Sequence, residues 1–119
     1  MKVQTGVNVR KTYDLEDRTL EFSKLFVNNL PKTVANVELS KQLIRSAGSV
    51  GANYIEANEA LGKKDFVMRA RIARKEAKET RYWLELVEFS ETQAQSHQNL
   101  VQEATELLKI LSAIIAKSQ

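Results

Sequence analysis

The residues whose spacing could do chemistry are four glutamate pairs, each separated by three positions. They are Glu56 with Glu59, Glu76 with Glu79, Glu85 with Glu88, and Glu103 with Glu106. Carboxylates at this spacing share a helix face, and four-helix bundles can hold di-iron sites with such residues. A di-iron site also needs Glu-x-x-His on two helices, and the single histidine, His97, has no such partner. We therefore expect no metal centre and no cofactor.

Other catalytic arrangements are missing from the sequence. The chain has no cysteine and one histidine, which removes thiolate nucleophiles and thiolate metal ligands together. It contains no Ser/His/Asp arrangement, Gly-rich phosphate loop or His-rich metal motif. Because no nucleophile, base and oxyanion donor occur in combination, the sequence predicts a protein that is not an enzyme.

Cations form the clearest chemical pattern. The segment from Lys63 to Tyr82 contains eight Lys or Arg residues against three acidic residues. The candidate nucleic-acid-binding residues are Lys63, Lys64, Arg71, Arg74, Lys75, Lys78 and Arg81. A helix that presents several cations can follow phosphates, but Tyr82 is the one nearby aromatic residue for base stacking. This pattern predicts phosphate contacts with weak sequence preference, or alternatively an ordinary solvated face offset by Glu76 and Glu79.

A polar stripe on the preceding helix has small residues where a solvated face would usually show Lys and Glu. The candidate residues for a polar network or oligomer interface are Gln42, Arg45, Ser49, Asn53, Glu56, Glu76 and Glu79. An inward carboxylate without a partner would be costly. We therefore expect Glu76 and Glu79 to bond to Arg45, Asn53 or Arg69.

These residues need a scaffold, and the composition indicates one small helical domain. The chain has 119 residues, of which 43% are hydrophobic and 28% charged, with one proline. Residues 1–12 lack periodicity and are predicted to be a mobile tail, and residues 13–119 to form the domain. No apolar run is long enough for a secretion signal or a membrane span, so we expect a cytoplasmic protein with no membrane partner.

The apolar spacing predicts four helices. They cover about 14–29, 36–60 with Asn36 as N-cap, 63–87 with Asp65 in its first turn, and 97–116. Leu30-Pro31 ends the first helix, and residues 90–96 form a polar connection. Short connections between long amphipathic helices favour an all-α, antiparallel up-down-up-down four-helix bundle.

The predicted core uses one face of each helix. The second helix contributes Leu39, Leu43, Ala47, Val50, Tyr54 and Leu61 or Asn58; the third contributes Phe66, Ala70, Ala73, Ala77, Thr80, Leu84 and Val87; the fourth contributes Leu100, Ala104, Leu107, Leu111 and Ile114. Gly48 and Gly51 are costly inside a helix, so they indicate close approach by another backbone, unless they are simply tolerated.

The second half of the chain has more apolar surface than one core seam requires. The candidate apolar oligomer-interface residues are Met68, Ile72, Trp83, Leu86, Val101, Leu108 and Ile115. Excess apolar width is expected where subunits pack side by side. It is equally expected if the last helix sinks deeply among the other three.

Two segments carry a family resemblance. QLIRSAGSVGANYIEANE from Gln42 to Glu59 and KKDFVMRARIARKEAKETRYWL from Lys63 to Leu84 resemble the bacterial 23S rRNA-intervening-sequence proteins. The similarity runs from about Tyr13 through the last helix. By resemblance, the family's polar and aromatic positions fall on Gln42, Arg45, Ser46, Ser49, Asn53, Glu56, Phe66 and Glu79. The family often has Glu-Gly where this chain has Glu56-Ala57.

The resemblance implies a homopentamer with a central channel. The family name refers to a location in ribosomal RNA genes and does not establish RNA binding, while a distant branch assists reverse transcriptases. We expect a non-enzymatic homo-oligomer that binds nucleic acid, structured RNA in preference, through the third helix. The alternative is a scaffold or accessory protein whose main partner is another protein, such as a reverse transcriptase-type enzyme.

Overall fold

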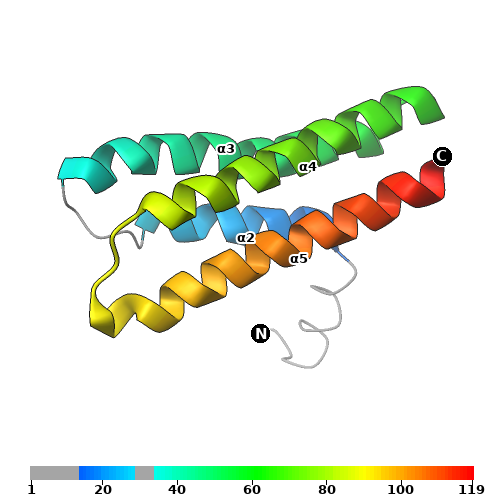
Figure 1. Cartoon of the computed structure of the whole chain (residues 1–119). Coiled ribbons are helices and arrows are strands. Elements are labelled where there is room, and N and C mark those ends of the chain that lie inside the picture. Colours follow the sequence, from blue (N-terminus) through cyan, green and yellow to red (C-terminus); the bar gives the residue numbers. More distant parts are fainter. Residues whose placement is uncertain (1–13, 29–33) are drawn as a thin grey trace, which may run out of the picture.

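The computed structural model describes residues 14–28 and 34–119, and these form helices without strands. The helices are α2 (Leu15–Asn28), α3 (Val34–Asn58), α4 (Lys63–Leu86) and α5 (Ala94–Ser118), with a short 3-10 helix, η1 (Glu91–Gln93), before α5. Figure 1 shows the four long helices running alternately in opposite directions. The all-α, four-helix prediction is therefore confirmed. The predicted tail and the Leu30-Pro31 helix end lie outside the described residues.

All four helices contribute to one core. Its buried residues include Phe22 and Phe26 from α2, Leu43, Ala47 and Val50 from α3, Ala73, Ala77 and Leu84 from α4, and Leu100, Ala104, Leu107 and Leu111 from α5. The α4 positions at the centre of this core are alanines, which let the neighbouring helices come close. The predicted α4 seam is confirmed, because Ala70, Ala73, Ala77 and Thr80 are all fully buried.

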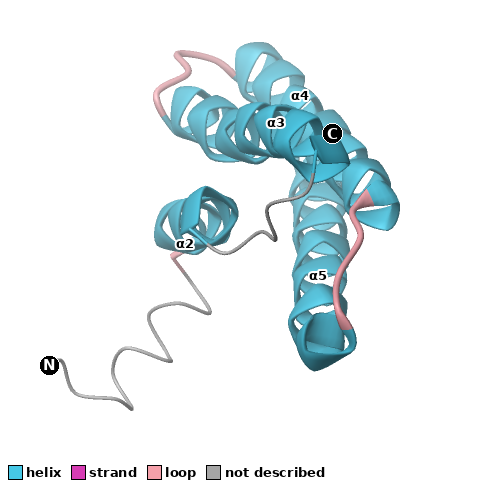
Figure 2. Cartoon of the chain, turned by 90° about the vertical axis from the view of Figure 1, so that its left-hand side faces the viewer, coloured by secondary structure: helices cyan, strands magenta, loops and turns pink. Residues whose placement is uncertain are grey.

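The helices pack in chain order, and the contact between the first and the last is thin. α2 packs on α3, α3 on α4 and α4 on α5, whereas α2 meets α5 at few positions. Figure 2 shows α2 set apart from α5 when the bundle is viewed from its end. An ion pair joins the two helices, with Arg18 Nε and Nη2 donating to Glu103 at 2.6 and 2.7 Å. These hydrogen bonds raise the pKa of Arg18 above its ordinary value.

Asn36 has a different role from the predicted one. α3 begins at Val34, so Asn36 lies inside the helix and is not its N-cap. Its buried side chain reaches the end of α4, where Nδ2 donates to the Glu88 carbonyl oxygen at 2.9 Å. Asn36 Oδ1 accepts from the Glu88 backbone N–H at 3.2 Å. The amide thus satisfies backbone groups that the end of α4 leaves without helical partners.

We expect Asn36→Ala to lower the free energy of unfolding by about 1–3 kcal/mol. Alanine leaves both Glu88 backbone groups without this partner in a partly buried place. Urea unfolding measures the change, with Gln42→Ala on the exposed side of α3 as the control. Equal stability losses in the two variants would show that the amide does not hold the end of α4.

Two helix boundaries differ from the predictions. α3 ends at Asn58, and neither Asn58 nor Leu61 belongs to the core, because both are exposed and Ala57 is buried instead. α5 begins at Ala94, three residues before the predicted start at His97. Ser90 and Gln93 form a reciprocal capping box ahead of it, so the connection is shorter than predicted. The Ser-x-x-Gln spacing was the signal for this boundary.

The two α3 glycines differ in their surroundings. A Cβ added to Gly51 would lie 2.9 Å from Thr19 Oγ1, so α2 packs closely against this position. A Cβ added to Gly48 would meet nothing within 4 Å. Close approach is therefore confirmed at Gly51, although the nearest atoms belong to a side chain and not to a backbone. Within one chain it is wrong at Gly48.

Candidate nucleic-acid interface

Exposed cations line one side of α4. The helix starts after Gly62, which has extended backbone angles (φ −143°, ψ 166°), and Asp65 lies in the first turn as predicted. Lys64, Arg71, Lys75 and Lys78 are spaced by seven, four and three residues and are all exposed. At 3.6 residues per turn, these spacings place them on one stripe of the helix. We call these four residues the α4 cation stripe.

Two further cations lean from this stripe toward α5. Arg74 Nη1 donates to Ser112 Oγ and Arg81 Nη1 donates to Thr105 Oγ1, each at 3.4 Å. Both arginines are half-buried, and these contacts hold their guanidinium groups over the boundary between α4 and α5. Lys63 is exposed at the start of the helix. The structure therefore brings the seven predicted cations to one side of the α4–α5 pair.

None of the seven cations has a carboxylate partner within 4.0 Å among the described residues. Other arginines of the chain do have such partners. Arg18 pairs with Glu103, and Arg45 pairs with Glu76 and Glu79. The α4 cations are thus free to meet an external anion without first breaking an internal ion pair.

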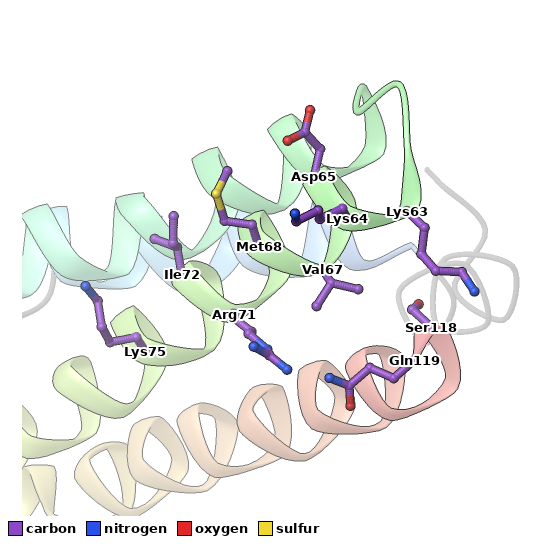
Figure 3. Close-up of a pocket in the computed structure, with 10 residues that line it drawn as sticks. All are labelled: Lys63, Lys64, Asp65, Val67, Met68, Arg71, Ile72, Lys75, Ser118 and Gln119. Carbon is purple, nitrogen blue, oxygen red and sulfur yellow. The ribbon is translucent and has the colours of Figure 1, made fainter.

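A groove of about 880 Å³ lies between the first half of α4 and the end of α5. Its lining combines cations with apolar side chains and comprises Lys63, Lys64, Asp65, Val67, Met68, Arg71, Ile72, Lys75, Ser118 and Gln119. In Figure 3, Val67 and Arg71 point toward α5, whereas Asp65 points to the opposite side of α4. The part of the groove next to α5 therefore presents positive charge beside an apolar wall.

The predicted polar network lies between α3 and α4 of the same chain. Arg45 Nη1 donates to Glu76 Oε1 at 3.4 Å, and Arg45 Nη2 donates to Glu79 Oε2. Trp83 Nε1 also donates to Glu79 Oε2, at 3.0 Å. The expected bonding of both glutamates to Arg45 is confirmed. Because one guanidinium spans two carboxylates a turn apart on α4, the network fixes the register of α3 against α4 without a second subunit.

Other members of the polar stripe bond along and between the same two helices. Arg69 Nη1 donates to Asn53 Oδ1 at 3.2 Å, and Asn53 Nδ2 donates to Ser49 Oγ at 2.9 Å. Asn53 and Arg69 thus bond to each other and not to the glutamates. Gln42 and Glu56 are exposed and take no part in the hydrogen bonds between described residues.

Thr80 and Ser46 add a buried contact that residue patterns did not predict. Thr80 Oγ1 donates to Ser46 Oγ at 2.8 Å, and both residues are fully buried. Thr80 was expected as a seam residue, and Ser46 entered through the family resemblance alone. A small polar residue within a seam of alanines was the available signal, since a buried hydroxyl needs a partner.

The predicted apolar interface residues divide into two groups. Ile115 is 3% exposed and belongs to the chain's own core, in the place predicted for Ile114. Trp83, Val101 and Leu108 are half-buried against that core. The width of the α5 apolar face is thus used mainly inside one chain. Three residues of α4 remain toward solvent: Met68, Ile72 and Leu86, the second of them half-buried.

The glutamate pairs do not assemble a metal site in the described part of the chain. No three His, Cys, Asp or Glu residues there lie close enough together to hold a metal ion. His97 instead donates from Nε2 to the Leu84 carbonyl oxygen at 3.0 Å and stacks on Phe89, with ring centroids 4.3 Å apart. Residues 14–28 and 34–119 also include no helix that is long and apolar enough to cross a membrane.

Comparisons with known proteins agree with this architecture. The family profile described as 23S rRNA-intervening sequence protein matches residues 9–113. A similar solved structure is a protein with unknown function from the S23 ribosomal protein family of Bacteroides thetaiotaomicron. It is 37% identical, with a TM-score of 0.65, and the match covers 88% of this chain and 94% of that chain. No curated protein matches. The chain therefore belongs to the 23S rRNA-intervening sequence protein family.

Proposed function

We propose that this protein is a non-enzymatic, cytoplasmic homo-oligomer that binds nucleic acid through α4, with structured RNA as the favoured ligand. The observation that carries this proposal is the contrast among the cations of the chain. Arg18 and Arg45 are neutralised by carboxylates, whereas the cations of the α4 stripe have no carboxylate within 4.0 Å among the described residues. Surface cations of this kind release counterions when they meet phosphates, which favours binding.

The dimensions of the stripe fit a nucleic-acid backbone. Lys64 and Lys78 are fourteen residues apart, roughly 21 Å along a helix that rises 1.5 Å per residue. Tyr82 is the exposed aromatic residue near the stripe, at 60% exposure. One aromatic residue provides little base stacking, so phosphate contacts dominate and sequence preference is weak.

Assembly would multiply this stripe. The family resemblance favours a pentamer, and the exposed Met68 and Leu86 on α4 supply apolar surface for contacts between subunits. Several copies of the stripe around one axis would contact more phosphates than one chain can reach. Affinity for a long structured RNA would then exceed affinity for a short oligonucleotide.

The test is a titration of a labelled RNA hairpin with the Arg71→Ala/Lys78→Ala variant. Both residues are exposed and hold no internal ion pair, so their removal leaves the described fold intact. We expect affinity at low salt to fall by about tenfold or more, because the variant cannot make two of the phosphate contacts of each chain. Fluorescence anisotropy measures the change.

The matched control is Lys24→Ala/Lys117→Ala, which removes the same charge from other surfaces. Lys24 lies on α2, paired with Glu21, and Lys117 lies in the last turn of α5 outside the groove lining. We expect this variant to bind like the parent at moderate salt. Equal reductions in affinity in both variants would show that net charge matters and that the α4 stripe has no special role.

A scaffold whose partner is another protein is the second candidate. The exposed Met68 and Leu86 favour it, because apolar side chains add nothing to phosphate binding. Such a partner, a reverse transcriptase-type enzyme among others, would bind with little dependence on ionic strength. RNA binding that is absent at low salt would favour this candidate.

A further inference from the structure

The outward side of α3 carries a narrow apolar strip. Val37, Ile44 and Ile55 are 45%, 43% and 46% exposed. Their spacings of seven and eleven residues place them within about 20° of one another around the helix axis. Gly48 lies on nearly the same line, between Ile44 and Ile55. We call Val37, Ile44, Gly48 and Ile55 the α3 strip.

Gly48 is the unusual member of this strip. Glycine inside a helix costs about 1 kcal/mol relative to alanine. At Gly51 that cost has a packing reason, because Thr19 Oγ1 lies 2.9 Å from the position of an added Cβ. At Gly48 the same construction meets nothing within 4 Å, so no described residue of this chain explains the glycine. A glycine among exposed apolar residues provides room for a group from outside the chain.

A second strip of the same length lies on α4. Met68 and Leu86 are 47% and 49% exposed. They are eighteen residues apart, as Val37 and Ile55 are, and each pair spans roughly 27 Å at 1.5 Å per residue. Lys75 lies on nearly the same line between them. We call Met68, Lys75 and Leu86 the α4 strip.

The two strips match when they are placed antiparallel. Setting Val37 opposite Leu86 places Ile55 opposite Met68. The same register places Gly48 opposite Lys75, since each of these three pairs sums to the same residue number. The long stem of Lys75 would then cross the helix where no side chain projects. A parallel register places Gly48 opposite Glu79, which already bonds to Arg45 and Trp83.

The charges beside the strips are also complementary. The outward sides of α2 and α3 carry more acid than base: Glu16, Asp17, Glu21, Glu38, Glu56 and Glu59, against Lys24 and Lys41. The α4 strip lies next to the basic side chains of Lys64 and Arg71. Opposite charges across an interface select the partner and its register.

We propose that the α3 strip of one copy packs antiparallel on the α4 strip of a second copy. The inference rests on the proposed function for the oligomer itself and adds which surfaces form it. Because the two strips are different surfaces of one chain, the contact is heterologous and repeats from copy to copy until a ring closes. Arg74 and Arg81, which lean toward α5, stay outside the contact and remain available to nucleic acid.

Cysteine cross-linking tests the register, since the chain has no cysteine of its own. Under mild oxidation, we expect the full-length Ile55→Cys/Met68→Cys variant to form a ladder of linked chains up to the oligomer number. Either single variant should remain unlinked. A ladder from Ile55→Cys/Leu86→Cys in its place would overturn the antiparallel register. Linked dimers from Ile55→Cys alone would overturn the heterologous contact, because they require two α3 strips to meet.

Light scattering on Ile44→Glu separates this inference from the proposed oligomer. A carboxylate in the centre of the strip should reduce the particle mass toward that of one chain, 13.5 kDa. Leu61→Glu is the control, because Leu61 is 101% exposed and lies off both strips. A parent that is itself monomeric would overturn the oligomer and this interface together. An oligomeric parent with an unchanged Ile44→Glu mass would overturn the interface alone.

Discussion

RNA binding is expected to weaken by roughly 10³–10⁵-fold between about 50 and 200 mM salt if the oligomer contacts 6–10 phosphates. One chain offers four exposed cations in the α4 stripe, Lys64, Arg71, Lys75 and Lys78. Two or three neighbouring chains therefore suffice for that number of contacts. The effect is large because these cations have no internal carboxylate to compete with phosphate, so each contact releases a counterion from the nucleic acid.

Anisotropy titrations of one RNA hairpin at several salt concentrations measure this dependence. The logarithm of the affinity should fall linearly with the logarithm of the salt concentration. Arg71→Ala/Lys78→Ala should reduce the slope by about 1 for each cation–phosphate pair that the variant cannot form, and Lys24→Ala/Lys117→Ala should keep the parent slope. Binding that is insensitive to salt would contradict phosphate contacts and favour a protein partner held by apolar surface.

Phe22→Ala is expected to lower the free energy of unfolding by about 3–5 kcal/mol. Phe22 is 1% exposed, and its ring meets Phe26 edge-to-face with centroids 5.2 Å apart. Truncation removes this buried surface, leaves a cavity and breaks the ring pair. The site is sensitive because α2 has few contacts with α5 and depends on α3 for its packing.

Urea unfolding at one fixed protein concentration measures this change, because the stability of an oligomer depends on concentration. Leu20→Ala is the matched control on the same helix, where the side chain is exposed. Its effect should stay within about 0.5 kcal/mol. A Phe22→Ala variant as stable as the control would show that the aromatic pair does not anchor α2.

Periodicity predicted those parts of the fold that depend on one helix at a time. The α4 seam of Ala70, Ala73, Ala77 and Thr80 follows from spacings of three and four, and the structure buries all four residues. The pairing of Arg45 with Glu76 and Glu79 was predictable as well. A buried carboxylate needs a cation, and few cations face α3 from α4 or α4 from α3.

Contacts between segments far apart in sequence were not predictable in this way. Asn36 resembled an N-cap by residue type, but its amide bonds to Glu88, 52 residues away. Arg18 and Glu103 are 85 residues apart, and no periodic signal in either helix indicates their ion pair. Both contacts depend on how the helices are placed relative to one another, which residue spacing within one helix does not specify.

The glycines show the same limit. Their cost in a helix predicted close approach at both Gly48 and Gly51, yet only Gly51 has a neighbour within the described chain, Thr19. Residue type alone does not indicate which neighbour fills the space. The α3 strip became visible only when the exposure of Val37, Ile44 and Ile55 was set beside the open space at Gly48.

Photo-cross-linking is the most direct test of nucleic-acid binding through α4. A structured RNA carrying a photoreactive base is bound to the full-length oligomer at low salt and irradiated, and the linked peptides are identified by mass spectrometry. We predict that the linked peptides lie within Lys63–Leu86, concentrated from Arg71 to Tyr82. Complexes whose cross-links fall only outside α4, or the absence of any complex at low salt, would contradict the proposed interface.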